Sequence, residues 1–292
     1  MKKSEMLLTL VSCFAAVVVC GTLAVLLIFL FAKGFPMLGK KLFFGAVSPA
    51  EALLGFKPVW DGIWPAVAGT LSLLCVTMFF ALFPGIGCGT FLACYATPRQ
   101  KYWLSLAVDL LAGIPSIVIG LFGFVLIVYL RRTFLPRGTT CLLLAAFCLS
   151  LLVLPALVVA TRGALEALPR NLALTGAALG FSHDQTVCRL LLPAAGKGIL
   201  GGIMLAMGRA AEDTAVIMLT GVVANAGLPA GLTSKFEALP FRIYYTAAQY
   251  TDQQELRSGF GAALVLLLLS GGLLFCAWGL QRSLERKWKG IR

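Results

Sequence analysis

The sequence predicts an all-α membrane protein with six transmembrane helices. Only 12% of its 292 residues are charged, its mean hydropathy is +0.94, and apolar runs of about twenty residues or more recur. A soluble domain carries about twice that share of charged residues, and roughly 20 apolar residues cross a bilayer as a helix. The alternating segments of about ten residues that build a transmembrane β-barrel are not visible.

The apolar runs place the expected spans at 6–32, 62–95, 103–130, 141–160, 198–224 and 259–280. The first run follows Lys2 and Lys3. It is too long for a signal-peptide core and no small-residue cleavage site follows, so we expect it to stay as a membrane helix. The second and third spans contain Pro84 and Pro115, so each is expected to bend or break. At Pro115 two interpretations stay open: a simple kink, or a broken helix whose ends meet an ion with the hydroxyl of Ser116.

An even number of spans puts both termini on the same side of the membrane. Lys and Arg are slightly more frequent in the segments on that side, and the C-terminal stretch QRSLERKWKGIR is strongly basic. Because positive segments stay in the cytoplasm, we expect both termini there. The net charge of +12 is spread over loops and the C-terminus. This distribution fits anionic lipid rather than nucleic acid.

The sequence offers no catalytic signature. The nine cysteines lack metal-ligand spacing, so we expect small buried apolar side chains and no metal. The segment GFPMLGKK at 34–41 has the glycines and lysine of a phosphate-binding loop, but Lys41 stands where a hydroxyl is required. No nucleophile elbow or zinc-protease motif is present. We therefore expect no cofactor and no enzymatic activity in this chain.

The connection at 161–197 is longer than a helical hairpin needs. It is rich in Ala and Leu, with Pro169 suited to start a helix and Gly180 to end one. We expect two short helices against the cytoplasmic face. They are either an interfacial amphipathic pair or a docking element for a cytoplasmic partner. His183, the only histidine, is interpreted as a surface or partner contact.

Charged residues inside the fifth span predict a functional site. Arg209 lies roughly 16 Å deep, near the bilayer midplane. An ionised side chain there costs about 2.5–3.5 kcal/mol, so it must face protein or water. Glu212 and Asp213 follow at helical spacing and can share its face. The planar guanidinium suits an oxyanion, with a carboxylate holding it in place when no anion is bound. The alternative is a structural ion pair between helices.

The 161–197 loop resembles the "EAA" loop of ABC importer permeases in its second half. The matching residues are Ala177, Ala178, Gly180, Leu192 and Pro193. The resemblance implies that these residues contact a cytoplasmic ATP-binding subunit. The first half departs from the family, because the Glu-Ala-Ala of the motif is replaced by Leu-Thr-Gly at 174–176. The contact that the glutamate makes in the family is therefore missing here.

Further segments resemble the PstA-type permeases of phosphate ABC importers, over residues 60 to 280. They are GIWPAVAGTLSLL, PGIGCGTFLACYA, LAGIPSIVIGLFG, LPALVVATRGALEALPRN, RAAEDTA and FEALPFRIYYTAAQ. The resemblance implies a type I (MetI-like) permease fold. The chain then comprises a first helix with an extracytoplasmic loop (1–60) and a permease core (61–285).

The family also implies the partners: a PstB-like ATP-binding subunit that hydrolyses ATP, a second, PstC-like permease, and an extracytoplasmic phosphate-binding protein. In the family's Arg-Ala-x-Gly-Glu-Thr-Ala motif, Arg209 and Thr214 match, Glu212 replaces the glycine and Asp213 replaces the glutamate. The implied phosphate path comprises these four residues and Ser116. The alternatives are a PstC-like subunit, a molybdate or sulfate permease, a proton-coupled secondary carrier, or a scaffold subunit.

Overall fold

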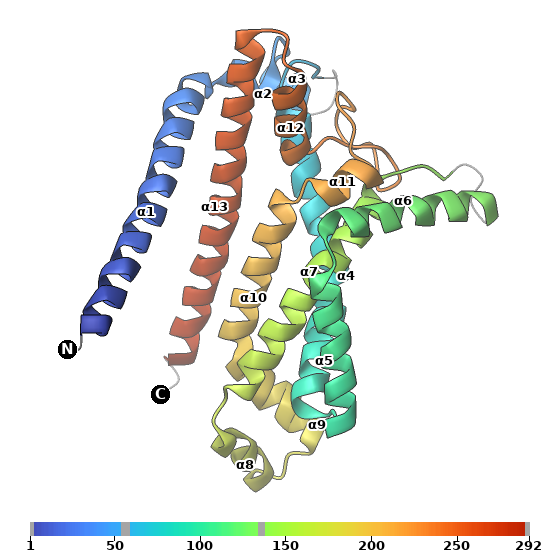
Figure 1. Ribbon diagram of the computed structural model, residues 1–292. Coiled ribbons are helices and arrows are strands. Elements are labelled where there is room, and N and C mark those ends of the chain that lie inside the picture. The colour runs from blue at the N-terminus through green and yellow to red at the C-terminus, as the bar shows by residue number, and fades with distance from the viewer. Residues whose placement is uncertain (1–2, 54–58, 134–137, 290–292) are drawn as a thin grey trace.

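The protein is built almost entirely from helices, and the computed structural model describes residues 3–53, 59–133 and 138–289. The long helices run along the molecule, and both termini point toward the end that carries α8 and α9 (Figure 1). We call this the α8 end, and the opposite end, with α2 and α12, the α12 end. In chain order the elements are α1 (Lys3–Gly34), η1 (Phe35–Met37), α2 (Lys40–Phe44), α3 (Pro49–Leu53), α4 (Trp64–Cys94), α5 (Pro98–Gly113), α6 (Ser116–Thr133), α7 (Leu142–Glu166), α8 (Arg170–Ala178), α9 (His183–Thr186), η2 (Val187–Leu191), α10 (Leu192–Glu212), α11 (Ala215–Thr220), α12 (Leu239–Gln249) and α13 (Gln253–Lys289).

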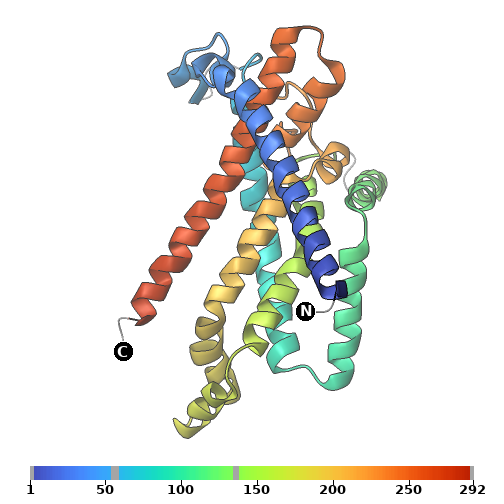
Figure 2. The same cartoon turned by 60° about the vertical axis from the view of Figure 1, so that its left-hand side comes forward.

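The expected all-α fold with six spans is confirmed. In the described part of the chain, six helical stretches are long and apolar enough to cross a membrane. α4 passes through Pro84 without ending. The third span is divided in two, because the chain breaks between α5 and α6. Ile114 is extended (ψ 126°), as expected for a residue that precedes proline. α6 then runs across the long axis, as Figures 1 and 2 show from two directions.

The fifth span also differs from its expected bounds of 198–224. The chain is helical from His183 through η2 to Glu212, so the helix begins and ends earlier than expected. It ends because Asp213 has an extended backbone (ψ 122°) and its Oδ1 accepts a hydrogen bond from the N–H of Val216, 2.9 Å away. A side chain that binds the backbone in this way competes with helix continuation. α11 then starts at Ala215 in a new direction.

The core lies where α7 packs between α4 and α10. Glycines permit close approach on both sides. On α4, a Cβ added to Gly89 would lie 2.6 Å from the Cβ of Thr161. On α10, a Cβ added to Gly202 would lie 2.3 Å from the Cβ of Ala160. Small residues at helix contacts let the backbones approach, which is the usual basis of packing in membranes.

At the α12 end, the segment that follows α11 completes the N-terminus of α7. Three N–H groups at the start of α7, which have no partner within the helix, donate to carbonyls of the last residue of α11 and of this segment. The pairs are Cys141 to Thr220, Leu142 to Ser234 and Leu143 to Leu232. Phe236 is fully buried beside them. The segment is therefore an integral part of the bundle.

The cysteines are only partly buried, so the expectation of buried side chains is wrong for most of them. Cys141 and Cys148 are buried, and Cys88 and Cys94 are half-buried. The other five lie exposed on outward-facing helix surfaces, which in this chain alone face lipid or another subunit: Cys13, Cys20, Cys75, Cys188 and Cys276.

The glycine contact between α10 and α7 gives a matched pair of variants. Gly202→Ala places a methyl group against Ala160, and overpacking of this kind costs about 1–3 kcal/mol. A Cβ added to the neighbouring Gly201 would meet no atom within 4 Å, so Gly201→Ala gains roughly 0.5–1 kcal/mol of helix propensity. We expect a lower Tm for the first variant and an unchanged or higher Tm for the second in detergent. Equal Tm values would show that the backbones are not in close contact.

Candidate functional site

Arg209 lies in the last turn of α10 on a face that this chain leaves uncovered. Arg209 and Glu212 are exposed, and Leu205, one turn earlier, is 67% exposed. Among the described residues, no ion pair or hydrogen bond involves Arg209. The carbonyl end of a helix favours a nearby cation. The guanidinium is thus held at a helix terminus with its donors available.

The carboxylate of Asp213 does not pair with Arg209, as was expected, but binds the backbone at the start of α11. The helical spacing predicts a pairing with Arg209, but α10 ends at Glu212 and the next residue leaves the helix. The carboxylate instead fastens the start of α11 through Val216. Thr214 is half-buried at the same junction. The structure therefore brings the RAAEDTA residues together at a broken helix without an internal salt bridge.

A second helix break lies against the first. Gly120 of α6 packs on the backbone of Ala215 and Val216, since an added Cβ would lie 3.0 Å from the carbonyl oxygen of Ala215. Ser116 precedes Gly120 by one helical turn and so shares its side of α6. Of the two interpretations left open at Pro115, the break is confirmed and the simple kink is wrong, because α6 leaves in a different direction from α5.

The 161–197 loop forms two short helices, as expected. α8 begins after Pro169, and the chain turns at Gly180 with φ +75°, a left-handed conformation that glycine adopts without strain. Ser182 then caps α9 through Gln185. Ala177, Ala178 and Gly180 are exposed at the tip of the loop. Leu192 and Pro193 lie instead in the first turn of α10.

These last two residues are part of the helical body rather than of the exposed tip. Pro193 is the second residue of α10 and directly follows the π-helical turn of η2. Leu192 packs against the cluster of Leu165, Ala195 and Ile199. The five residues that resemble the EAA loop therefore divide into an exposed group and a packed group.

α9, which follows the tip of the loop, is fastened to the end of α4. The hydroxyl of Tyr95 donates to Asp184 Oδ1 at 2.8 Å, and His183 Nε2 donates to the carbonyl oxygen of Cys94 at 3.1 Å. The rings of Tyr95 and His183 meet edge to face at 4.9 Å. The hydrogen bond to Asp184 raises the pKa of Tyr95 to about 12, so the hydroxyl remains a donor at physiological pH. We call this group the Tyr95 contact.

A second polar group joins α5 to α7 at the same end. Glu166 Oε1 accepts from Lys101 Nζ at 2.6 Å and from Arg162 Nε at 3.0 Å. Arg162 also donates to the hydroxyl of Ser105 at 2.8 Å. These side chains are partly exposed, so each ion pair alone contributes little to stability. The carboxylate that the two cations share nevertheless fixes the relative position of the two helix ends.

At the α12 end, the sequence reasoning missed a buried acid. Glu237 is 3% exposed; its Oε1 accepts from the N–H of Gly227, and its Oε2 lies 3.9 Å from Arg242 with no hydrogen bond. Arg242 donates to Asn225, which has φ 55°. Burial raises the pKa of the Glu237 carboxyl above 4.5, against the opposing effects of Gly227 and Arg242. The sequence did offer a signal for this site: Glu237 and Arg242 have opposite charges and lie five residues apart, shortly before the last span.

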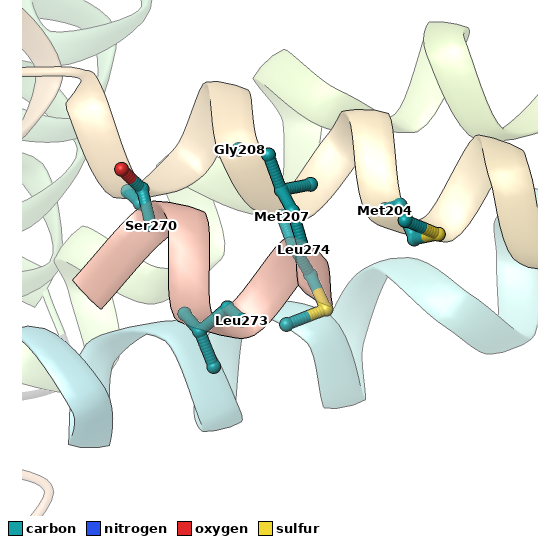
Figure 3. A pocket seen from close by; sticks show the side chains of 7 residues that line it. Met204, Met207, Gly208, Ser270, Leu273 and Leu274 are labelled. Carbon is teal, nitrogen blue, oxygen red and sulfur yellow. The ribbon is translucent and has the colours of Figure 1, made fainter. Parts of the chain in front are cut away.

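Two hollows in the surface lie near these charged residues, one beside Arg242 and one beside the turn that carries Arg209. A cavity of about 640 Å³ at the α12 end includes Arg242 and Lys41 together with Asp61 and Glu255, so it carries both signs of charge. A small recess between α10 and α13 adjoins the Arg209 turn (Figure 3). It is apolar and too small for a water molecule, and is lined by Met204, Met207, Gly208, Ala211, Ser270, Leu273 and Leu274. We assign no ligand to this recess.

The buried acid predicts a pH dependence of stability. The pKa of Glu237 is higher in the folded than in the unfolded protein. The contribution of the protonated carboxyl to folding stability is therefore fully present below pH 4.5 and is lost as pH rises through the folded pKa. Glu237→Gln keeps an acceptor for Gly227 and removes the charge. We expect this variant to melt at a higher temperature than the wild type at neutral pH, with the two Tm values converging in acid.

Melting curves from about pH 4 to about pH 8 test this expectation. Asp252→Asn is the control, since Asp252 is an exposed acid at the same end. Parallel Tm profiles for the wild type and Glu237→Gln would contradict it.

The chain is similar to known permeases over most of its length. Residues 85–290 match the family described as "Binding-protein-dependent transport system inner membrane component". The phosphate transport system permease protein PstA of Haemophilus influenzae is 32% identical over 82% of this chain and 80% of its own length. The probable phosphate transport system permease protein PstA of Methanocaldococcus jannaschii is 30% identical over 71% and 72% of the respective chains.

The fold has relatives among solved structures. A chain of the MetNI methionine ABC transporter, in an inward-facing conformation, superposes with a TM-score of 0.59 at 19% identity, over 82% of this chain and 99% of the other. At this identity the likeness shows the fold, which is that of a MetI-type ABC permease as expected. The chain therefore belongs to the family of binding-protein-dependent transport system inner membrane components and is a multi-pass inner-membrane permease subunit of an ABC importer, not an enzyme.

Proposed function

We propose that this chain is the PstA-type permease subunit of an ATP-driven importer of inorganic phosphate. The observation that carries the proposal is Arg209, a guanidinium at the end of a broken helix that has no ion pair among the described residues, in a chain about 30% identical to phosphate permeases. A planar fork of donors that stays protonated matches the oxygens of phosphate. Family membership implies an ATP-binding subunit and a substrate-binding protein, and excludes the carrier interpretation.

The substrate path, in this proposal, runs past Arg209, Glu212, Asp213, Thr214 and Ser116. Arg209 binds the oxyanion. The hydroxyls of Thr214 and Ser116 offer further hydrogen bonds from the two helix breaks. Asp213 acts by holding the start of α11, and through it the shape of the site. Because the Arg209 face is exposed in this chain, a second permease closes the path.

The partners and the orientation follow from the same proposal. The α8 end faces the cytoplasm, with both termini, and the α12 end receives phosphate from an extracytoplasmic binding protein. A PstB-like subunit binds the exposed Ala177, Ala178 and Gly180, while Leu192 and Pro193 pass its movement into α10. The second permease is PstC-like or a copy of this chain. Residues 1–60 form a first helix with its outer loop, and residues 61–285 form the permease core.

One observation favours a second candidate function, that of a PstC-type permease subunit. The phosphate transport system permease protein PstC of Mesorhizobium japonicum is 29% identical to this chain, but over only 59% of it and 58% of its own length. The longer match to PstA proteins favours the PstA-type assignment. Uptake of labelled phosphate, sulfate and molybdate by cells with and without the chain tests the anion. Uptake that favours sulfate or molybdate would overturn the phosphate assignment.

Arg209 provides the first functional prediction. Arg209→Ala removes one charge-assisted contact to the anion, so phosphate uptake should fall by roughly 10- to 100-fold. Arg209→Lys keeps the charge without the planar fork and should retain part of the uptake. Both variants should still co-purify with the ATP-binding subunit, which shows intact assembly. Wild-type uptake by the alanine variant would remove Arg209 from the path.

Gly180 provides the second functional prediction. Its φ of +75° is inaccessible to proline, so Gly180→Pro should displace the loop tip and separate ATP hydrolysis from uptake. Gly180→Asn is the matched control, because asparagine tolerates the left-handed region. The measurement is the ratio of phosphate transported to ATP hydrolysed in the reconstituted transporter. An unchanged ratio in the proline variant would refute the docking assignment.

A further inference from the structure

The Tyr95 contact joins two segments that are remote in the sequence. Tyr95 follows the last residue of α4, and Asp184 lies in α9, 89 residues later. Two hydrogen bonds and an edge-to-face ring contact act together there, one of them from a tyrosine hydroxyl to a carboxylate. Hydrogen bonds to an ionised acceptor are stronger than neutral ones. The contact is therefore a specific attachment of the loop to α4.

The loop is also continuous with α10. His183 begins a helical stretch that runs without interruption to Glu212, through the π-helical turn of η2. Arg209 stands near the far end of this stretch. A displacement of α9 is thus transmitted along one helix to the proposed anion site.

α8 packs directly on α9. Gly176 of α8 lies against Thr186, and an added Cβ would lie 2.6 Å from its hydroxyl oxygen. This contact accounts for a glycine at the position where the family motif has alanine. The exposed tip and α9 therefore form one unit.

α4 and α10 are also joined through α7. Gly89 brings α4 against α7 at Thr161, and Gly202 brings α10 against the adjacent face of α7 at Ala160. The loop is thus connected to the core at two places, through the helix of α10 and through the Tyr95 contact with α4. Loss of the second connection leaves the loop attached to the core through α10 only.

We propose that Tyr95 and His183 are positioning residues that fasten the ATPase-docking loop to α4, so that α4, α7 and α10 move as one body when ATP is hydrolysed. The proposal rests on the proposed function, in which the loop binds the ATP-binding subunit. It assigns coupling to a side-chain contact outside the EAA-type motif.

The test uses the complete transporter, reconstituted with its ATP-binding subunit, second permease and binding protein. Tyr95→Phe removes only the hydroxyl, and Asp184→Asn removes the charge of its acceptor. We expect ATP hydrolysis to continue in both, while phosphate transported per ATP falls roughly tenfold, as for the loss of one charge-assisted hydrogen bond. The double variant should be no worse than the single ones, because both break the same interaction.

Two further comparisons separate positioning from general destabilisation. Tyr102→Phe is the control, since Tyr102 is 65% exposed on α5, contacts Trp103, and has no hydrogen bond among the described residues. His183→Gln keeps a donor for the Cys94 carbonyl and should preserve the transport ratio, whereas His183→Ala should lower it. If Tyr95→Phe fails to assemble, the two His183 variants provide the test.

The outcomes distinguish the contact from the function. A wild-type transport ratio in Tyr95→Phe and His183→Ala overturns the Tyr95 contact while leaving the importer assignment intact. Additive losses in the double variant overturn the pairwise interaction. A wild-type complex that hydrolyses ATP without moving phosphate overturns the proposed function, and the coupling proposal falls with it.

Discussion

α7 lies between α4 and α10, and at both contacts glycines bring helix backbones together with little side chain between them. Gly89 faces Thr161 on one side, and Gly202 faces Ala160 on the other. Inside a membrane, lipid is as apolar as leucine, so such close packing, rather than apolar burial, holds helices together. The resulting three-helix body is the frame that fixes both the loop at the α8 end and the Arg209 region.

Two helix breaks lie against each other on this frame. α5 ends before Pro115 and α10 ends before Asp213, and the segments that follow meet where Gly120 packs on Ala215. Broken helices expose backbone groups and polar side chains within the membrane, which is tolerated only where protein or water covers them. The uncovered Arg209 face therefore fits a path completed by a second permease.

The sequence predicted the helical class, the number of spans and the two-helix loop, because each follows from local apolar runs or turn residues, and it left both a kink and a break open at Pro115. It did not predict the end of α10, since Asp213 acts through a hydrogen bond to Val216 rather than as a partner of Arg209. Tyr95 and Glu237 were missed for another reason. Their roles depend on partners that the fold brings together, and for Tyr95 that partner is 89 residues away.

The central claim is that the 161–197 loop transfers the energy of ATP to phosphate movement past Arg209. The most direct measurement is phosphate uptake into proteoliposomes that hold the complete transporter, with ATP supplied on the side of the α8 end and any proton gradient collapsed. The account predicts uptake that requires ATP and persists without the gradient. Uptake that continues without ATP, or that stops when only the gradient is removed, would contradict it.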